Sequence, residues 1–418
     1  MARRWLGTPA LLAALVSCDS HPVPRPGPAA SAAAPRALLP TATPSASAPL
    51  PVVSAPPPAS PPLPPPAPVG DACRLTRGPI QLSYTGPVTL VADGVDGDPR
   101  VIFNYGGVPR AVRLPSGKAA DAGKPERLTL SEPAERAGSP ACAVAGDALF
   151  CLDGAGAVHR SRVSGDGSAV VAQARPGSPV AAASVAGAHV VYAFLADRRT
   201  TEGTTTLAYA ALDDAPPVVL SEDGSGATFV TLASRGDDAL AMYIDARRVL
   251  TPVHARVLRP AGTLALGPDA VVFVGGGTDG RTPGALAQGA SGHALALLPL
   301  DKDDHAFGMV SIRVEEQPRD DSATTWSLYP TALERAAVVA TQGQWPIRVL
   351  RTLPSSADPK GKRVLELGEL DAAGAWKALC PVAEGAAFGE LAVLADRAGA
   401  LWIAYTDVDG TWIEKRGR

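Results

Sequence analysis

Short apolar runs separated by turn residues recur along most of this chain, and no other feature restricts its fold as strongly. From about residue 80 onward, runs of four to seven apolar residues alternate with Gly, Asp, Pro and Ser, and helical periodicity is almost absent. A unit of strand, Gly/Asp turn, apolar strand, loop and further strand repeats in residues 141–163, 183–214, 231–259, 264–280 and 391–417. Weaker copies occupy residues 96–114 and 333–353. The repetition predicts a series of small antiparallel sheets.

About seven copies at roughly 45–50 residues each fit a domain in which every copy forms one four-stranded blade. Long inserts at 275–293, 300–326 and 354–375 make the spacing uneven. The pattern resembles that of β-propeller domains of bacterial envelope lipoproteins, although the copies lack the Gly-His and Trp-Asp signature of WD40 blades. The resemblance implies an all-β fold, a β-propeller of about six to seven blades over residues 71–418. Tandem β-sandwiches are the alternative, because short, evenly spaced strands suit both folds.

The first residues, "MARRWLGTPALLAALVSCDS", have the composition of an export signal. Arg3 and Arg4 precede a mostly apolar stretch, residues 5–16, that is too short to span a bilayer. The stretch ends in Leu-Val-Ser-Cys18, which resembles the lipobox of bacterial lipoproteins, and an ordinary secretory signal is the alternative. The resemblance implies that residues 1–18 are a lipoprotein signal peptide and that Cys18 carries a lipid. We therefore expect an extracytoplasmic protein, lipid-anchored to the bacterial membrane in the periplasm or at the cell surface.

Residues 19–70 predict a disordered tether. Residues 21–70 contain 18 prolines, many alanines and only two charged side chains, Arg25 and Arg36. Proline fixes φ and lacks a backbone donor, so the segment cannot build helices or sheet ladders. A polyproline-II chain rises about 3.1 Å per residue, which gives a spacer on the order of 150 Å at full extension.

The charge of the expected folded part argues against nucleic acid as a partner. Residues 71–418 contain 34 basic and 40 acidic side chains, a formal net charge of −6. No Lys/Arg cluster stands out in this part, whereas nucleic-acid binding needs a basic patch. The expected partners are the membrane, through the lipid anchor, and an envelope protein or a glycan.

The stretch "ACAVAGDALFC" predicts a disulfide bond. A two-residue hairpin over Gly146-Asp147 places Cys142 opposite Cys151 as a non-hydrogen-bonded pair, with Cα atoms about 4.5 Å apart. Outside the cytoplasm such a pair is a structural staple. If the chain is a propeller, ring closure brings its first and last segments together, and a Cys73–Cys380 bond is then expected among the possible pairings.

No catalytic signature is present among the common motifs: HExxH, GxSxG and Walker A sequences are all missing. Gly275 to Gly280 match the letters of a dinucleotide fingerprint, but Pro283 and Gly284 oppose the helix that must follow it. The six histidines are scattered, as expected for turn or surface positions. We expect no cofactor, with Ca²⁺ the one cation for which the sequence offers a weak candidate.

That candidate is the loop at 92–100, which contains Asp93, Asp96 and Asp98. Oxygen-rich loops bind Ca²⁺, and this one faintly resembles the calcium-binding repeats of integrin-type propellers. The loop departs from them at Pro99, where that family continues with Gly. A solvated loop is the simpler interpretation.

Two tryptophans, Trp326 and Trp345, border long loops and are weak candidates for stacking on sugars, with packing between blades as the alternative. Trp402 lies in a strand pattern and is expected in the core. The sequence as a whole predicts a binding or scaffolding module without catalytic activity. The alternative is a carbohydrate-active hydrolase or lyase with paired carboxylates at the mouth of the propeller.

Replacing Cys18 by Ser is expected to abolish lipidation, because the lipid is joined to the cysteine sulfur. Metabolic labelling with a radioactive fatty acid and membrane fractionation would measure it. The Ser17→Ala variant keeps a small residue before Cys18 and serves as the control that retains the label. A Cys18→Ser protein that still carries the label would contradict the lipobox interpretation.

Overall fold

The computed structural model describes most of the chain from Ala72 to Gly417. The ranges outside the description are 1–71, 93–97, 115–125, 129–139, 165–166, 202, 223–225, 246–249, 277–284, 289–292, 300–306, 314–318, 321–325, 328–335, 341–346, 359–360, 371–375, 397–398 and 418. Two units divide the chain, residues 1–63 and 64–418, and every described residue belongs to the second. Cys18 and the expected tether therefore lie outside the described residues.

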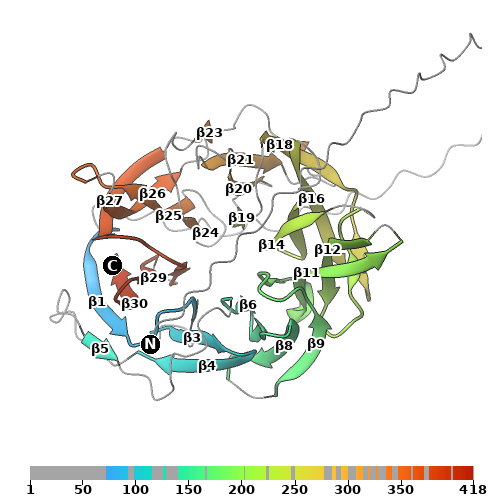
Figure 1. Cartoon of the computed structure of the whole chain (residues 1–418), viewed down its shortest axis with the longest axis horizontal. Helices are drawn as coiled ribbons and strands as arrows, with labels where there is room; N and C mark the ends of the chain where they lie inside the picture. Colours follow the sequence, from blue (N-terminus) through green and yellow to red (C-terminus); the bar gives the residue numbers. More distant parts are fainter. Residues whose placement is uncertain are drawn as a thin grey trace, which may run out of the picture. The chain divides into compact units, whose positions relative to one another are not determined.

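The described residues form seven β-sheets, each of which is one blade of a β-propeller (Figure 1). The first blade contains β2 (Val88–Val91), β3 (Arg100–Tyr105) and β4 (Val108–Arg113). The second contains β6 (Ala143–Ala145), β7 (Ala148–Leu152), β8 (Ala157–Arg162) and β9 (Ala169–Gln173). The third contains β10 (Ala181–Ser184), the 3-10 turn η3 (Ala186–Ala188), β11 (Val190–Thr200), β12 (Gly203–Leu212) and β13 (Val218–Val219).

The remaining four blades follow in chain order. The fourth contains β14 (Ala227–Arg235), β15 (Asp238–Asp245), β16 (Leu250–Pro260), β17 (Leu264–Leu266) and β18 (Ala270–Gly276). The fifth contains β19 (Ala285–Gln288), β20 (His293–Pro299), β21 (Phe307–Arg313), β22 (Arg319–Asp320) and β23 (Trp326–Ser327). The sixth contains β24 (Ala336–Ala340), β25 (Ile347–Pro354), β26 (Arg363–Leu370) and β27 (Trp376–Gly385). The seventh contains β28 (Leu391–Ala395), β29 (Leu401–Asp407), β30 (Gly410–Arg416), β1 (Leu75–Leu82) and β5 (Glu126–Leu128).

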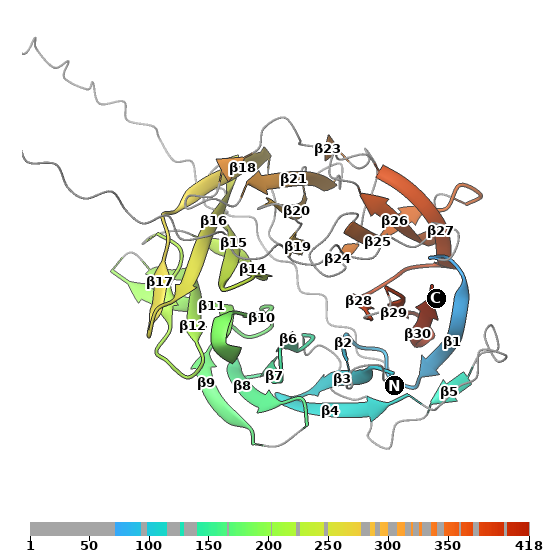
Figure 2. The ribbon, with the colours of Figure 1, turned by 180° about the vertical axis from the view of Figure 1, so that it is seen from behind.

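The first strand of each blade contacts the first strand of the next, and these contacts close into a ring. The series runs β2, β6, β10, β14, β19, β24 and β28, and β28 contacts β2 again. Figure 2 shows these strands around the centre, with the later strands of each blade farther out. The predicted β-propeller is therefore confirmed, with seven sheets among the described residues.

The structure corrects where two of the repeat units lie. Residues 264–280, expected to be a copy of their own, supply β17 and β18, both of which pair with β16 of the fourth blade. The fifth blade comes instead from 285–327, which the sequence pattern placed mostly in inserts. The insert at 354–375 likewise contains β26, the third strand of the sixth blade. The blade to which a strand belongs depends on which strands it pairs with, and the apolar pattern of the sequence does not show those partners.

The ring closes by pairing the two ends of the domain in one sheet. β1 lies antiparallel to β30, with Ile80 opposite Ile413, so the N-terminal strand completes the seventh blade. Gly78 allows this approach, because a side chain there would meet the Ile413 carbonyl oxygen at 2.7 Å and its φ of +88° is unfavourable for other residues.

The expected disulfide bond between Cys73 and Cys380 is present, with Cα atoms 6.0 Å apart. It ties the residue ahead of β1 to β27 of the sixth blade. Arg416 holds the same junction, since its guanidinium donates to the Cys73 carbonyl at 3.2 Å and the Val382 carbonyl at 3.1 Å. Its Nε donates to Glu414 at 2.5 Å. Burial raises the pKa of Glu414, while the charge and hydrogen bond of Arg416 oppose that rise.

The second expected disulfide bond is also present, and its register is the predicted one. Ala145 pairs with Ala148, Val144 with Leu149 and Ala143 with Phe150. Gly146 supplies the positive φ, 58°, that this tight turn needs. Cys142 and Cys151 are consequently bonded, with Cα atoms 4.5 Å apart.

The hydrophobic core lies between the blades rather than at the centre of the ring. Phe150 of the second blade stacks on Tyr192 of the third, with ring centroids 4.6 Å apart, and both are fully buried. Similar apolar clusters join the third and fourth blades, the sixth and seventh, and the seventh and first. Trp402 belongs to the last of these, as expected. In the blades whose side chains the structure describes, these clusters bury one blade face against the next.

Removing the ring-closing disulfide is expected to cost more stability than removing the hairpin disulfide, because it closes a far longer loop. The sequence separations are 307 and 9 residues. Chain entropy alone sets upper values of about 5.7 and about 2.7 kcal/mol respectively. Urea unfolding of the Cys73→Ser/Cys380→Ser and Cys142→Ser/Cys151→Ser proteins would measure the two losses. An equal or larger loss in the hairpin variant would contradict this ranking.

Candidate functional site

The residues that the sequence singled out do not meet in one place. Asp93, Asp96 and Trp345 lie outside the described residues, and only the backbone of Trp326, in β23, is described. Asp98 forms an ion pair with Arg77 of β1, at the contact between the first and seventh blades. Among the described residues, no group of three His, Cys, Asp or Glu side chains is arranged to hold a metal ion. Within the same residues, no helix has the length and apolar character to cross a membrane.

Three histidines each contact an aspartate of their own blade. His159 Nε2 lies 3.0 Å from Asp153, His189 Nδ1 lies 2.6 Å from Asp213, and His254 Nδ1 lies 2.8 Å from Asp269. His254 is a correction to the expectation of turn or surface positions, because it is buried. It stacks on Tyr243, which faces it across β15 and β16, with ring centroids 4.8 Å apart.

The buried group around Asp269 stabilises the fourth blade. Asp269 accepts a hydrogen bond from His254, and Arg256 lies 3.2 Å from its other oxygen. Burial by itself would raise the pKa of Asp269, but the hydrogen bond from His254 and the charges of His254 and Arg256 hold it below its usual value. These contacts link β15 and β16 to the residue ahead of β18 within one blade, and we assign them a structural role.

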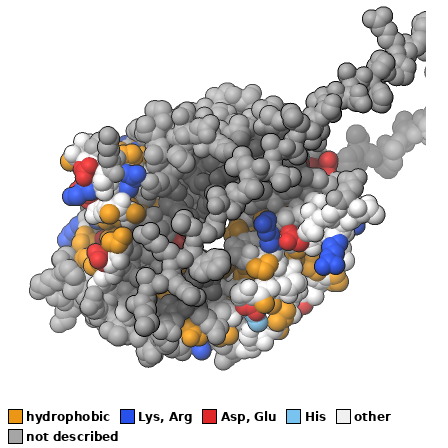
Figure 3. Space-filling model, viewed as in Figure 1, with side chains coloured by type: hydrophobic (Ala, Val, Ile, Leu, Met, Phe, Trp, Pro, Cys, Tyr) orange, Lys and Arg blue, Asp and Glu red, His pale blue; other side chains and the backbone are white. Residues whose placement is uncertain are grey.

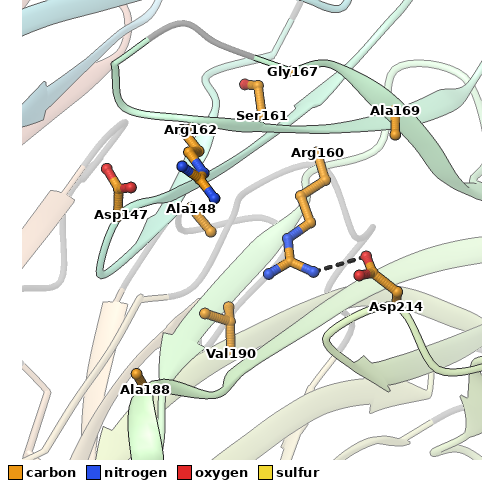
Figure 4. A pocket seen from close by; sticks show the side chains of 10 residues that line it. All are labelled: Asp147, Ala148, Arg160, Ser161, Arg162, Gly167, Ala169, Ala188, Val190 and Asp214. Carbon is orange, nitrogen blue, oxygen red and sulfur yellow. Dashed lines mark hydrogen bonds and ion pairs between the residues drawn. The ribbon is translucent and has the colours of Figure 1, made fainter.

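A cavity of about 380 Å³ lies between the second and third blades, and its size is in the range of small-ligand sites. We call it the Arg160 cavity (Figure 4). Its lining comes from β7, β8 and β9 on one side and from η3, β11 and the turn after β12 on the other. The residues are Asp147, Ala148, Arg160, Ser161, Arg162, Gly167, Ala169, Ala188, Val190 and Asp214.

Arg160 crosses the cavity from β8 and is fixed in place. Its Nη1 donates to Asp214 at 2.7 Å, and its Nη2 lies 3.8 Å from Asp213. Beneath it, the guanidinium carbon lies 6.0 Å from the centre of the buried Phe150 ring. Burial and, secondarily, the charge of Asp214 raise the pKa of the adjacent Tyr192 to about 12. Tyr192 therefore stays protonated and donates to the Val171 carbonyl at 3.3 Å.

Arg162 and Asp147 line the other end of the cavity, as Figure 4 shows. Side chains alternate along a strand, so Arg160 and Arg162 share one face of β8 while Ser161 lies on the opposite face (Figure 4). Neither Arg162 nor Asp147 makes a side-chain hydrogen bond or ion pair with any residue that the structure describes. Both are exposed, so a free donor and a free acceptor stand together here.

The counterpart of Arg162 in the fourth blade is Arg259. Arg162 pairs with Ala148, the first residue of β7, and Arg259 lies in the same way beside Asp238, the first residue of β15. Arg259 has a partner, because its Nε lies 3.6 Å from Asp238. The same position in the register is therefore satisfied in one blade and left open toward a cavity in the other.

The wall of the Arg160 cavity on the third blade contains two unusual backbone conformations. Ala188 and Asp213 have φ values of 65° and 49°, and they are the only residues other than glycine with positive φ in the described part of the chain. Asp213 is held by the amide of Val190 at 3.0 Å and by His189. Such conformations persist only where surrounding contacts impose them, and they are typical of functional sites.

A second cavity, of about 530 Å³, lies on the other side of this wall, between the third and fourth blades. We call it the Pro260 cavity. Its lining is Ala186, Gly187, His189, Leu212, Asp213, Asp214, Ala215, Pro260 and Gly262. Asp214 lines both cavities, so the turn after β12 separates them.

The sequence contains only a weak signal for this site. The β8 segment "AVHRSR" places two arginines two residues apart, and "LDDAP" follows the apolar β12 strand. Each pattern is common in surface turns. What makes them a site is the facing of two different blades, which strand patterns do not specify.

Comparison with known proteins places the chain by its fold alone. No protein-family model matches the sequence, and no curated protein does. The BP39L lectin of Burkholderia pseudomallei is similar in structure, with 14% identity, a TM-score of 0.50, and coverage of 79% of this chain and 98% of the lectin. The WD40 repeats of RRP9 are 12% identical with a TM-score of 0.47, and the match covers 82% of this chain and 97% of RRP9. A six-bladed fucose-recognising lectin from Aleuria aurantia is 12% identical with a TM-score of 0.37, and the match covers 65% of this chain and 90% of the lectin.

Replacing Asp269 by Asn is expected to destabilise the protein by about 2 kcal/mol at pH 7, since a buried hydrogen bond to a charged group is lost. The folded pKa of Asp269 is lowered, so its contribution is present above its usual value of 3.8 and is lost as the pH falls through the folded pKa. Urea unfolding between pH 7 and pH 3 should therefore show the gap from wild type shrinking in acid. Asp238→Asn, at a weaker and more exposed pair, is the control; a pH-independent gap for Asp269→Asn would contradict the assignment.

Proposed function

We propose that the propeller is a binding module that recognises a saccharide in the Arg160 cavity. The observation that carries the proposal is the free pair at one end of that cavity, Arg162 and Asp147, beside the fixed Arg160–Asp214 pair. A guanidinium only donates hydrogen bonds and a carboxylate only accepts them. A ligand with several hydroxyl groups, each of which donates and accepts, satisfies both at once.

The apolar part of the lining supports the same ligand class. Ala148, Ala169, Ala188 and Val190 supply the apolar part of the lining. Small-molecule sites combine apolar walls with a few placed polar groups, and the C–H faces of a sugar ring need such walls. Figure 3 shows that described side chains on one face of the domain mix apolar with charged types, including both signs of charge. The lectins that share the propeller fold are consistent with this use of it.

The cellular setting belongs to the same proposal. A lipid on Cys18 would anchor the chain to a bacterial membrane, and the proline-rich residues 19–70 would hold the propeller away from it. A binding module presented in this way meets envelope or extracellular glycans. The support for this part is the sequence of residues 1–70.

Replacing Arg162 by Gln is expected to weaken saccharide binding roughly 10- to 100-fold, because charge-assisted hydrogen bonds are lost. A glycan array would identify ligands of the wild-type protein, and calorimetry would then measure the loss. Arg259→Gln is the matched control, since it occupies the same register in the fourth blade and lines neither cavity. It should bind as the wild type does.

Three other outcomes would decide against the proposal. Equal losses in both variants would move the site away from the Arg160 cavity. An empty array, with affinity capture returning an envelope protein, would favour the scaffolding alternative. Release of shorter saccharides from bound glycans would favour the carbohydrate-active hydrolase or lyase.

A further inference from the structure

The two cavities differ in chemistry although they share a wall. The Arg160 cavity has two arginines and two aspartates in its lining. The Pro260 cavity is lined beyond the shared turn by Ala186, Leu212, Ala215, Pro260 and two glycines, with His189 the one basic side chain. His189 already contacts Asp213 at 2.6 Å. The Pro260 cavity therefore offers mostly apolar surface to a ligand.

The shared wall is preformed and joins the two cavities. Asp213 contacts His189 on the Pro260 side and Arg160 on the other, and Asp214 pairs with Arg160 at 2.7 Å. The Ala215 amide donates to the Leu212 carbonyl at 2.9 Å, which fixes the turn. Asp214, which lines both cavities, is mostly exposed, with 77% of its side chain accessible.

We propose that one ligand occupies both cavities, with a saccharide unit in the Arg160 cavity and an apolar group attached to it in the Pro260 cavity. This inference rests on the proposed function and narrows it to glycoconjugates that carry an alkyl, acyl or similar apolar substituent. The polar unit satisfies Arg162 and Asp147, and the substituent passes over Asp214. Apolar surface that is buried against Leu212, Ala215 and Pro260 then adds to the affinity.

The expected gain follows from the burial of methylene groups. Each methylene that the Pro260 cavity removes from water should tighten binding roughly fourfold. Binding of a bare saccharide gains nothing there. The affinity of a series with one sugar and a growing alkyl chain therefore reports directly on the second cavity.

The test compares methyl, butyl and octyl glycosides of glucose, galactose, mannose and fucose, each kept below its micelle-forming concentration. Calorimetry or ligand-observed NMR with the whole protein gives the affinities. For the sugar that binds, the butyl and octyl glycosides should bind at least tenfold more tightly than the methyl glycoside. Pro260→Glu, which places a charge on the fourth-blade side of the Pro260 cavity, away from the shared wall, should remove this gain while leaving the methyl glycoside unchanged.

Ala265→Glu is the matched control, because Ala265 is exposed on β17 and lines neither cavity. It should keep the full gain. A methyl glycoside that binds as tightly as its octyl counterpart overturns the inference and leaves the proposed function standing. If the octyl glycosides of all four sugars bind equally well, and Arg162→Gln does not weaken their binding, then the two cavities do not bind one ligand together. If no glycoside of any sugar binds, the proposed function fails and the inference fails with it.

Discussion

The pairing of β1 with β30 is the constraint on which the rest of the structure depends. The third blade is apolar on both faces, and it packs one face against the second blade and the other against the fourth. An open ring would leave two such faces in water, at the first and seventh blades. The closing strand, the Cys73–Cys380 bond and the hydrogen bonds of Arg416 act together at that one junction. Closure of the ring thus decides whether the facing sides of the first and seventh blades are buried.

The candidate site is a space that side chains leave unfilled between the second and third blades. Tyr192 and Phe150 fill the interface between the second and third blades at depth, and above them the contact is left to Arg160, Asp214 and short side chains. Arg162 faces this gap from the second blade and Asp213 contributes to its wall from the third. Hydrogen bonds from Val190 and His189 hold Asp213 of this wall in a left-handed conformation. In a preformed cavity of this kind, binding of a ligand does not cost the free energy of ordering the walls.

Features that depend on neighbouring residues were predictable from the sequence. The Cys142–Cys151 hairpin has the predicted register because two strands joined by two residues have little freedom in how they pair. The fold and the approximate number of blades followed from the repeat of short strands. The content of the fifth blade did not, because residues 285–327 carry their strands among stretches that resemble inserts. Residues 264–280 look like a further unit, yet they complete the fourth blade by pairing with β16.

The sequence by itself determined most of the strands outside the fifth blade, the tight turns and the local disulfide bond, since each depends on residues a few positions apart. It also determined the export-like and proline-rich character of residues 1–70. Only the tertiary structure decided which strand face meets which neighbour, and therefore that Arg160 and Arg162 line a cavity against the third blade. The reason is geometric: alternation along a strand defines two faces, but the identity of the blade opposite each face is set by closure of the ring.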